Sequence, residues 1–115
     1  MIDLVFETGK SVFQTPLRMI WLPVEYDQEF PVKVCVSVPK RRMKKANQRN
    51  RMKRLLRESY RLHKEILIDH CHKHQKSFAI MFIAQSNAPL KYAETEEKII
   101  LLLQRLTRIN AKVAE

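Results

Sequence analysis

The stretch Phe78-Ala79-Ile80-Met81-Phe82-Ile83-Ala84 decides the fold, since it is the longest uninterrupted apolar run in the chain. An apolar run without a polar interruption is typical of a β-strand that is buried on both faces, or nearly so. It is far shorter than the roughly 20 apolar residues that a membrane-spanning helix needs. The run therefore predicts a buried strand and excludes a membrane span.

One helix is expected before this strand in the sequence, and another is expected after it. From about Ala46 to about Asp69, apolar residues recur with the 3.6-residue period of an amphipathic helix. Asn87-Ala88-Pro89 breaks the chain after the strand, and a last helix is expected from about Tyr92 to about Ile109. Both helices carry an apolar stripe, so we expect them to pack on a sheet.

Further strands are expected in the first third of the chain. Side chains alternate over Leu17–Leu22 and again over Val32–Val38, with the period of two that a strand requires. The acidic stretch Pro23–Pro31 is expected to join these two strands as an exposed hairpin loop. Lys10–Gln14 is expected to add a short edge strand.

A short helix is expected over Ile2–Thr8, closed by Gly9 where a helix end favours a left-handed residue. Because so short a helix is marginal alone, we expect that natural residues precede Met1. The predicted order is α-β-β-β-α-β-α, an α+β sandwich with helices packed on a small four-stranded sheet. A chain of 115 residues and 13.7 kDa has the size of a single domain, residues 1–115.

Composition excludes several classes of protein. Gly9 is the only glycine, so the glycine-rich loops of Walker and dinucleotide-binding folds are absent. The two cysteines, Cys35 and Cys71, cannot form the disulfide framework of a small secreted domain, and no secretory signal is recognisable; we expect free thiols and a cytoplasmic location. No metalloprotease, serine-hydrolase or two-metal motif occurs, so we expect no catalytic residues and no autonomous activity.

Positive charge is concentrated in one segment. The chain has 22 Lys and Arg against 12 Asp and Glu, a net charge of +10. Between residues 40 and 61 the only acid is Glu58, and the basic residues are Lys40, Arg41, Arg42, Lys44, Lys45, Arg49, Arg51, Lys53, Arg54, Arg57 and Arg61. A polyanion that binds there relieves the self-repulsion and releases its counterions, which favours nucleic acid over a solvated face or an anionic membrane surface.

The expected central helix presents much of this charge along one side. On a helical wheel, the arc next to the apolar stripe holds Arg49, Asn50, Lys53, Arg54, Arg57, Arg61 and Lys64. Arg51 falls near the opposite border of the apolar stripe. For Arg51 we therefore expect a separate contact, in a neighbouring groove.

The string His70-Cys71-His72-Lys73-His74 is a weak candidate for a metal site. His70 and His74 are spaced i, i+4, with Cys71 as a soft ligand between them. A structural zinc site draws on two such pairs, and this string falls where the central helix is expected to end in a polar loop. We therefore assign no metal to His70, Cys71, His72 or His74, and we expect Cys35 to be a small buried thiol.

The chain resembles the bacterial ribonuclease P protein subunit. Ser37-Val38-Pro39-Lys40-Arg41, followed by Lys45-Ala46-Asn47-Gln48-Arg49-Asn50-Arg51-Met52-Lys53-Arg54-Leu55-Leu56-Arg57-Glu58-Ser59-Tyr60-Arg61, is similar to that family's Arg-Asn-Arg-x-Lys-Arg signature after a strand ending in Ser-Val. Phe6-x-x-Gly9-x-Ser11 resembles the end of the family's first helix. Tyr92-Ala93-Glu94-Thr95-Glu96 resembles the beginning of its last helix.

The resemblance implies an accessory subunit of a ribonucleoprotein endonuclease that removes the 5′ leader from precursor tRNA. The RNA subunit, with bound magnesium, would perform the hydrolysis, and the partners would be this catalytic RNA and precursor tRNA, with no DNA and no membrane. The implied fold includes a left-handed βαβ crossover around the central helix. Carried over by position, the contacts to the catalytic RNA would be Lys45, Arg49, Asn50, Arg51, Lys53, Arg54, Arg57 and Arg61.

The resemblance also implies a cleft for the leader, between a sheet face and the central helix. The residues expected there are Phe6, Phe13, Ile20, Ser37 and Lys40. The side of the expected strand that carries Lys33, Cys35 and Ser37 is polar or small, which suits an extended single strand. Phe6 is the best ring for stacking on a base, although a core position in the first helix is the alternative.

Three positions depart from the family pattern. Ile20 stands where relatives often carry a cleft tyrosine, so that Trp21 or Phe13 would have to replace this ring. Lys44-Lys45 stands where many relatives have Gly-Asn, with one extra residue upstream. The basic and aromatic residues usual before the first helix are absent.

The sequence leaves two other functions open. One is a structural RNA-binding protein such as a ribosomal component, and the other is a DNA-binding module.

Overall fold

The computed structural model describes residues 9–114, which form one four-stranded sheet and three helices. The elements are β1 (Lys10–Gln14), β2 (Leu17–Val24), β3 (Val32–Ser37), α2 (Ala46–His63), α3 (Glu65–His74), β4 (Ser77–Ala84) and α4 (Tyr92–Ala114). The predicted strands and the predicted start of the last helix are confirmed. The helix expected over Ile2–Thr8, which includes Phe6, lies outside the described residues.

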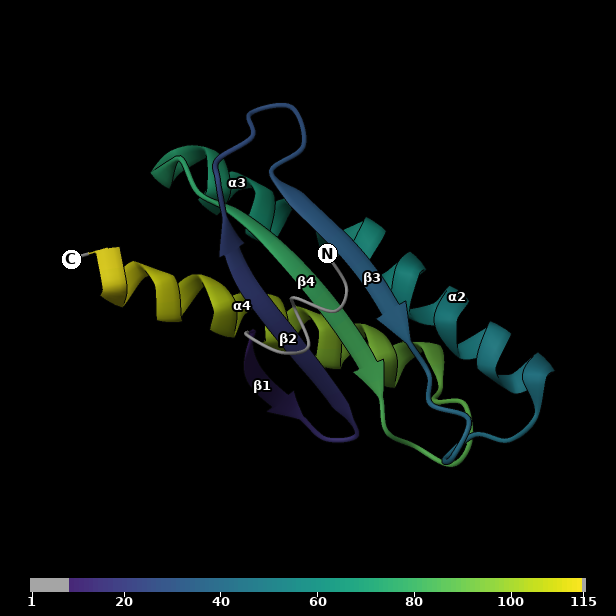
Figure 1. The fold of residues 1–115 in the computed structure, drawn as a ribbon. Coiled ribbons are helices and arrows are strands. Elements are labelled where there is room, and N and C mark those ends of the chain that lie inside the picture. Colours follow the sequence, from purple (N-terminus) through teal and green to yellow (C-terminus); the bar gives the residue numbers. More distant parts are fainter. Residues whose placement is uncertain (1–8, 115) are drawn as a thin grey trace.

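The strands lie in the order β1-β2-β4-β3 (Figure 1). β1 and β2 form an antiparallel hairpin, β2 and β4 are antiparallel, and β3 and β4 are parallel. The prediction that residues 23–31 form a hairpin loop between two paired strands is wrong, because β4 lies between β2 and β3. An alternating pattern shows which side of a strand is buried, but it does not show which strand is the neighbour.

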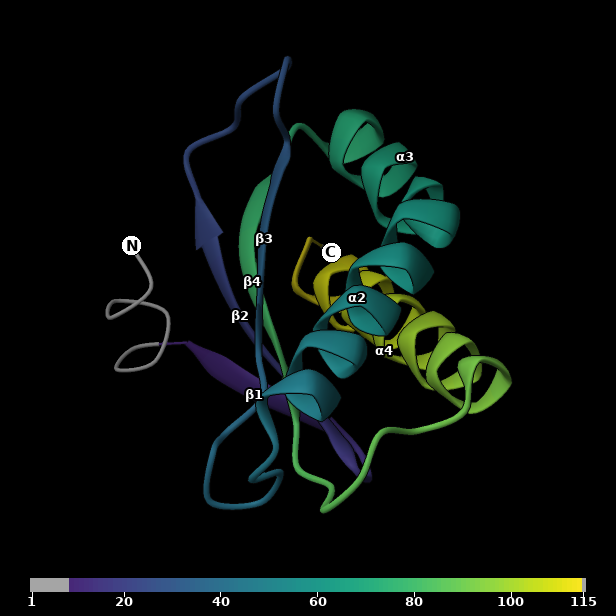
Figure 2. The same cartoon turned by 90° about the vertical axis from the view of Figure 1, so that its right-hand side faces the viewer.

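The three helices cover one face of the sheet, which we call the helix face (Figure 2). β4 is buried at every position, as its apolar sequence predicts. Its side chains alternate between the main core on the helix face and a smaller cluster on the opposite face, which we call the second face. The half-buried Cys35 packs against that smaller cluster. Among the described residues, no helix is long and apolar enough to cross a membrane.

The connection from β3 to β4 is a left-handed crossover. When the sheet is viewed from the helix face with both strands pointing up, β4 lies to the left of β3, and α2 and α3 lie in front (Figures 1 and 2). Crossovers between parallel strands are right-handed in about 98% of cases. The rare hand is the one that the family resemblance implies.

The single helix predicted over residues 46–69 is in fact two helices that meet at Lys64. Met52 and Leu56 of α2 are fully buried, and so are Leu67 and Cys71 of α3. In one straight helix, at about 100° per residue, Met52 and Cys71 would point about 100° apart. The break at Lys64 allows both ends to face the same core.

Candidate nucleic-acid interface

Arg49 ties the loop between β3 and α2 to the helix. The amides of Arg42 and Met43 both donate to the carbonyl of Pro39, at 3.2 Å, and Met43 is fully buried. Nη1 of Arg49 donates to the carbonyls of Met43 and Lys44, at 3.0 and 2.8 Å. Part of the Arg49 guanidinium therefore holds the loop, a role that its position in the basic stripe does not reveal.

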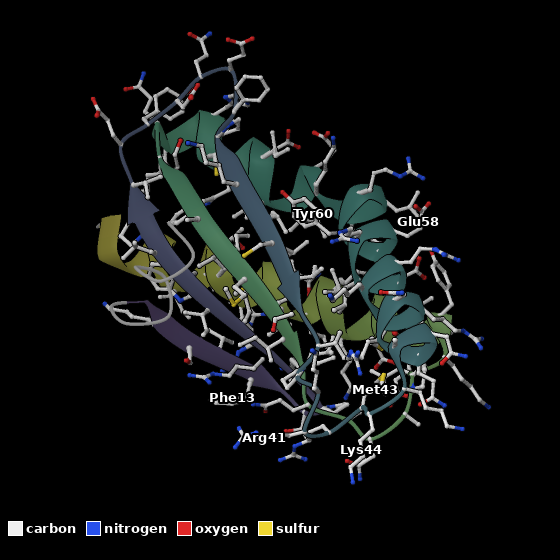
Figure 3. All side chains as sticks on the ribbon, turned by 45° about the vertical axis from the view of Figure 1, so that its right-hand side comes forward. Phe13, Arg41, Met43, Lys44, Glu58 and Tyr60 are labelled. Atoms are coloured by element: carbon white, nitrogen blue, oxygen red, sulfur yellow. The ribbon has the colours of Figure 1, made fainter. Side chains whose placement is uncertain are left out.

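The solvent side of α2 carries a shallow hollow of about 400 Å³, which we call the cationic groove; it is lined by Asn50, Lys53, Arg54, Arg57, Glu58 and Arg61. The structure thus brings together most of the side chains predicted on this arc. Figure 3 shows Glu58 on the side of α2 that faces away from the sheet, whereas Tyr60 points toward the sheet.

The cations of this groove are largely without counterions. Among the described residues, Arg61 is the only one of them that pairs with a carboxylate, that of Glu58. This hydrogen bond is the main reason why the pKa of Glu58 lies below its ordinary value. Lys53, Arg54 and Arg57 have no such partner in the described structure, so their charge is available to an external anion.

Arg51 lies apart from the cationic groove, as the helical wheel predicts. It lines a second hollow, of about 330 Å³, where the first turns of α2 meet the segment before α4. We call this the Arg51 hollow, and its lining residues are Asn47, Gln48, Arg51, Pro89, Leu90 and Lys91. Sequence reasoning missed the residues from 89 to 91, because nothing local indicates that they lie beside α2.

Phe13 and Ser37, both predicted to contact a leader, lie in one row across the second face. The register aligns Phe13 with Arg18, Arg18 with Ile83, and Ile83 with Ser37. Neighbouring strands are about 4.8 Å apart, so the row is about 14 Å long. Arg18 lies over the Phe13 ring, 5.5 Å from its centroid, and donates to Oγ of Ser11. Arg18 was not among the predicted site residues.

The other predicted leader residues are placed differently. Ile20 is on the second face but only 1% exposed, so it offers no surface to a base. Trp21 points to the helix face, where its ring meets Phe78 edge-on at 5.9 Å, and it cannot replace the missing tyrosine. Lys40 is exposed in the loop after β3. The expectation that the central helix borders this face is wrong, because α2 packs on the helix face.

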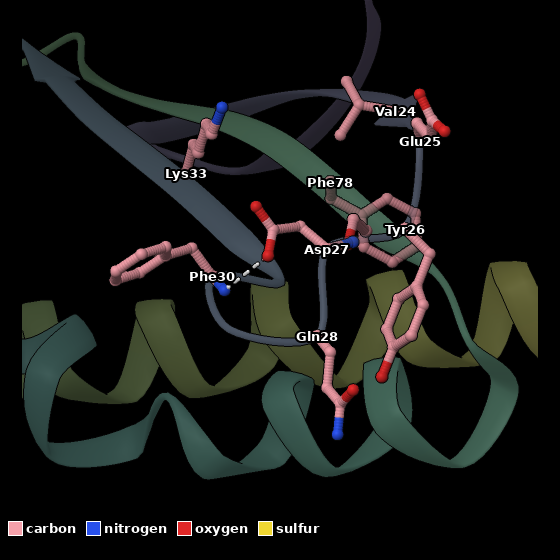
Figure 4. Close-up of a pocket in the computed structure, with 9 residues that line it drawn as sticks. Val24, Glu25, Tyr26, Asp27, Gln28, Phe30, Lys33 and Phe78 are labelled. Carbon is pink, nitrogen blue, oxygen red and sulfur yellow. Dashed lines mark hydrogen bonds between the residues drawn. The ribbon is translucent and has the colours of Figure 1, made fainter.

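A third hollow, of about 520 Å³, lies at the loop between β2 and β3 (Figure 4). The Asp27 carboxylate accepts the backbone N–H groups of Glu29 and Phe30, both at 3.0 Å, and the Asp27 N–H donates to Oγ of Ser77 at 2.8 Å. Figure 4 shows the carboxylates of Glu25 and Asp27 at this hollow. They disfavour phosphate, so this hollow is chemically unlike the surfaces along α2.

The histidine-rich string lies on α3, which continues to His74 and ends at Gln75 with a φ of 53°. The expectation that this string falls where the helix ends in a polar loop is therefore wrong. Cys71 is buried in the core, and burial raises its pKa to about 11. The rings of His70 and His74 are 4.5 Å apart. No group of three His, Cys, Asp or Glu side chains that could hold a metal occurs in the described part of the chain.

Glu96 links the end of α2 to the start of α4. Its carboxylate lies 3.1 Å from Nε2 of His63 and accepts the hydroxyl of Tyr92, also at 3.1 Å. These two hydrogen bonds lower the pKa of Glu96. The link joins the last residue of α2 to the first turns of α4.

The fold and the surface charge define a small basic α+β protein that presents one cationic helix to solvent. The family model described as Ribonuclease P matches residues 1–107. The chain belongs to this family.

Relatives with a related sequence carry the same description. A ribonuclease P protein component of Porphyromonas gingivalis is 37% identical over 86 residues, which are 75% of this chain and 63% of that protein. One of Chlorobaculum tepidum is 51% identical over 45 residues, 39% of this chain and 29% of that protein. The match thus spans less than two thirds of the length of these relatives.

Solved structures share the fold. The ribonuclease P protein of Thermotoga maritima has a TM-score of 0.69 at 23% identity, covering 90% of this chain and 89% of that one. The ribonuclease P protein of Staphylococcus aureus has a TM-score of 0.68 at 20% identity, covering 91% and 87%. At these identities the likeness shows the fold alone.

Proposed function

We propose that this chain is the protein subunit of a cytoplasmic ribonuclease P. In this role it binds the catalytic RNA and the 5′ leader of precursor tRNA, and it promotes removal of the leader by the RNA. The observation that carries the proposal is the cationic groove, where Lys53, Arg54 and Arg57 lack carboxylate partners within the described structure. Family membership supplies the identity of the polyanion.

The catalytic RNA would bind along α2. Lys53, Arg54 and Arg57 offer three charged contacts to phosphates, and Asn50 at the same groove offers an amide. Lys45, just before α2, would extend this contact. Arg49 would act mainly by positioning the loop that carries Lys45.

The leader would cross the second face along the row from Phe13 to Ser37. Phe13 is 50% exposed, so part of its ring is open to a base, while Arg18 lies over the ring and supplies charge. Stacking on an aromatic ring tolerates any base. Such tolerance suits leaders that differ from one tRNA to the next, and Lys40 beyond Ser37 would hold the backbone.

Magnesium would be held mainly by the RNA. Among the described residues that line the cationic groove, Glu58 is the one carboxylate, and it is already paired with Arg61. No acid lies in the row from Phe13 to Ser37. These residues suit phosphate better than a divalent cation, which fits an accessory role for the protein.

Reconstitution tests the proposal. The purified chain alone should leave precursor tRNA intact, and the catalytic RNA of the same genome should cleave poorly at low magnesium. Adding the chain should restore cleavage. A ribosomal protein would bind RNA without restoring it, and a DNA-binding module would be displaced from RNA by duplex DNA; either result would refute the proposal.

The leader path has its own test. Phe13→Ala should weaken binding of precursor tRNA by the reconstituted enzyme by about 1–3 kcal/mol, the value of one stacked base, while binding of mature tRNA stays unchanged. Phe30→Ala is the matched control, because Phe30 is 61% exposed but lies in the loop between β2 and β3. Equal effects of the two substitutions would exclude a specific platform at Phe13.

A further inference from the structure

The Arg51 hollow has the size of a site for one small unit of a ligand. Its volume of about 330 Å³ lies at the lower end of the range of about 300–1,000 Å³ that ligand pockets occupy. α2 supplies one wall and residues 89–91 supply the other. The cationic groove uses a different set of α2 side chains, so the two sites do not compete.

The rim of the hollow carries positive charge without a counterion. Arg51 and Lys91 are both exposed. Neither side chain pairs with a carboxylate in the described structure, and no acid lines the hollow. An arginine fork beside a lysine is well suited to a phosphate group.

The floor of the hollow is apolar and held in place. Leu90 packs against the main core, and its backbone N–H donates to Sδ of the fully buried Met52 at 3.4 Å. Pro89 has a ring-restricted backbone. The core contacts and this hydrogen bond hold the floor in place, so the face of a flat ring can pack on it with little rearrangement of the protein.

The third element is a pair of amides at the start of α2. Oδ1 of Asn47 accepts the backbone N–H of Gln48 at 2.9 Å, so the Asn47 amide group keeps its donors. The Gln48 side chain is half-buried at the hollow. Side-chain amides carry both donors and acceptors and can read the edge of an unpaired base.

We propose that the Arg51 hollow binds one unstacked nucleotide of the catalytic RNA. The base packs on Pro89 and Leu90 with its edge toward Gln48, and its phosphate lies between Arg51 and Lys91. This inference rests on the proposed function, and it adds a base-reading site to phosphate binding. α2 then contacts the RNA on two sides.

Binding measurements separate the parts of this site. Gln48→Ala should weaken binding of the catalytic RNA about tenfold with an unchanged salt dependence, because it removes a contact to a base. Lys91→Ala should weaken binding and reduce the slope of log affinity against log salt by about one, because it removes a phosphate contact. Lys73→Ala is the control, because Lys73 is an exposed lysine of α3 that lines neither site.

Tethered cleavage locates the nucleotide. In a Cys35→Ser background, which leaves only the buried Cys71, an iron chelate is attached to Lys91→Cys and, separately, to Arg54→Cys. The two probes should cut different segments of the RNA. Removing the base of the nucleotide mapped from position 91 should cost about tenfold in affinity, and Gln48→Ala should then cost nothing more.

The outcomes distinguish the two proposals. If the wild-type chain does not bind the catalytic RNA, the proposed function itself fails. If the wild type binds but Gln48→Ala and Lys91→Ala behave like Lys73→Ala, only the nucleotide site is refuted. If removing the mapped base leaves the affinity unchanged, the hollow contacts only a phosphate, and the inference is likewise refuted.

Discussion

Replacing Arg54 and Arg57 with glutamine should change how RNA binding depends on salt. Both arginines are exposed in the cationic groove without a carboxylate partner in the described structure, and glutamine keeps a similar helix propensity. Each phosphate contact contributes about −0.9 to the slope of log affinity against log salt, so losing two contacts makes the slope shallower by about 1.8. Between 50 and 200 mM salt, the wild type should therefore lose about 12-fold more affinity than the variant.

The assay is a filter-binding titration with the catalytic RNA at four salt concentrations. The matched control replaces Lys73 and Arg108 with glutamine, which removes the same charge from exposed positions on α3 and α4. Circular dichroism should show folded protein in all three samples. If the control lowers the slope as much as the Arg54 and Arg57 variant, overall charge and not the groove explains binding.

Three further predictions concern stability. Arg49→Gln should lower the free energy of unfolding in urea by about 1.5 kcal/mol, because two loop carbonyls lose a charged donor; a change below about 0.5 kcal/mol would leave Arg49 without a structural role. Ser59→Ala should raise the melting temperature, because the buried Oγ of Ser59 has no hydrogen-bond partner among the residues that the structure describes, and a lower value would refute this. The pKa of Glu96 lies below its ordinary value of 4.5, so its bonds to neighbouring side chains stabilise the fold above about pH 4.5, and this stabilisation is lost as the pH falls through the lowered pKa. Glu96→Gln should flatten the decline of the melting temperature in acid, and parallel curves would contradict that assignment.

The elements whose pattern depends only on neighbouring residues were predictable from the sequence. The apolar run at Phe78 and the alternation around Val34 each depend on nearby residues alone, and both became strands at the expected positions. The stripe of Lys53, Arg54 and Arg57 follows from helical periodicity in the same way. The helical wheel also predicts that Arg51 lies apart from that stripe, and in the structure Arg51 lines a different hollow.

Features that depend on distant residues were not predictable. Whether β2 pairs with β3 is decided by β4, which comes more than fifty residues after β2 begins. The break at Lys64 depends on the shape of the core that α2 and α3 share. The side of the sheet to which Trp21 points, and the use of Arg49 to hold a loop, also depend on contacts that no local pattern encodes.

The position of β4 between β2 and β3 has a consequence for biosynthesis. A ribosome makes β1, β2, β3 and α2 before it makes β4. Until then, β3 has no strand to pair with and the sheet remains in two pieces, so tertiary folding of the nascent chain waits for its last third. The cationic helix α2 is thus synthesised before β4, the central strand of the sheet that it packs against.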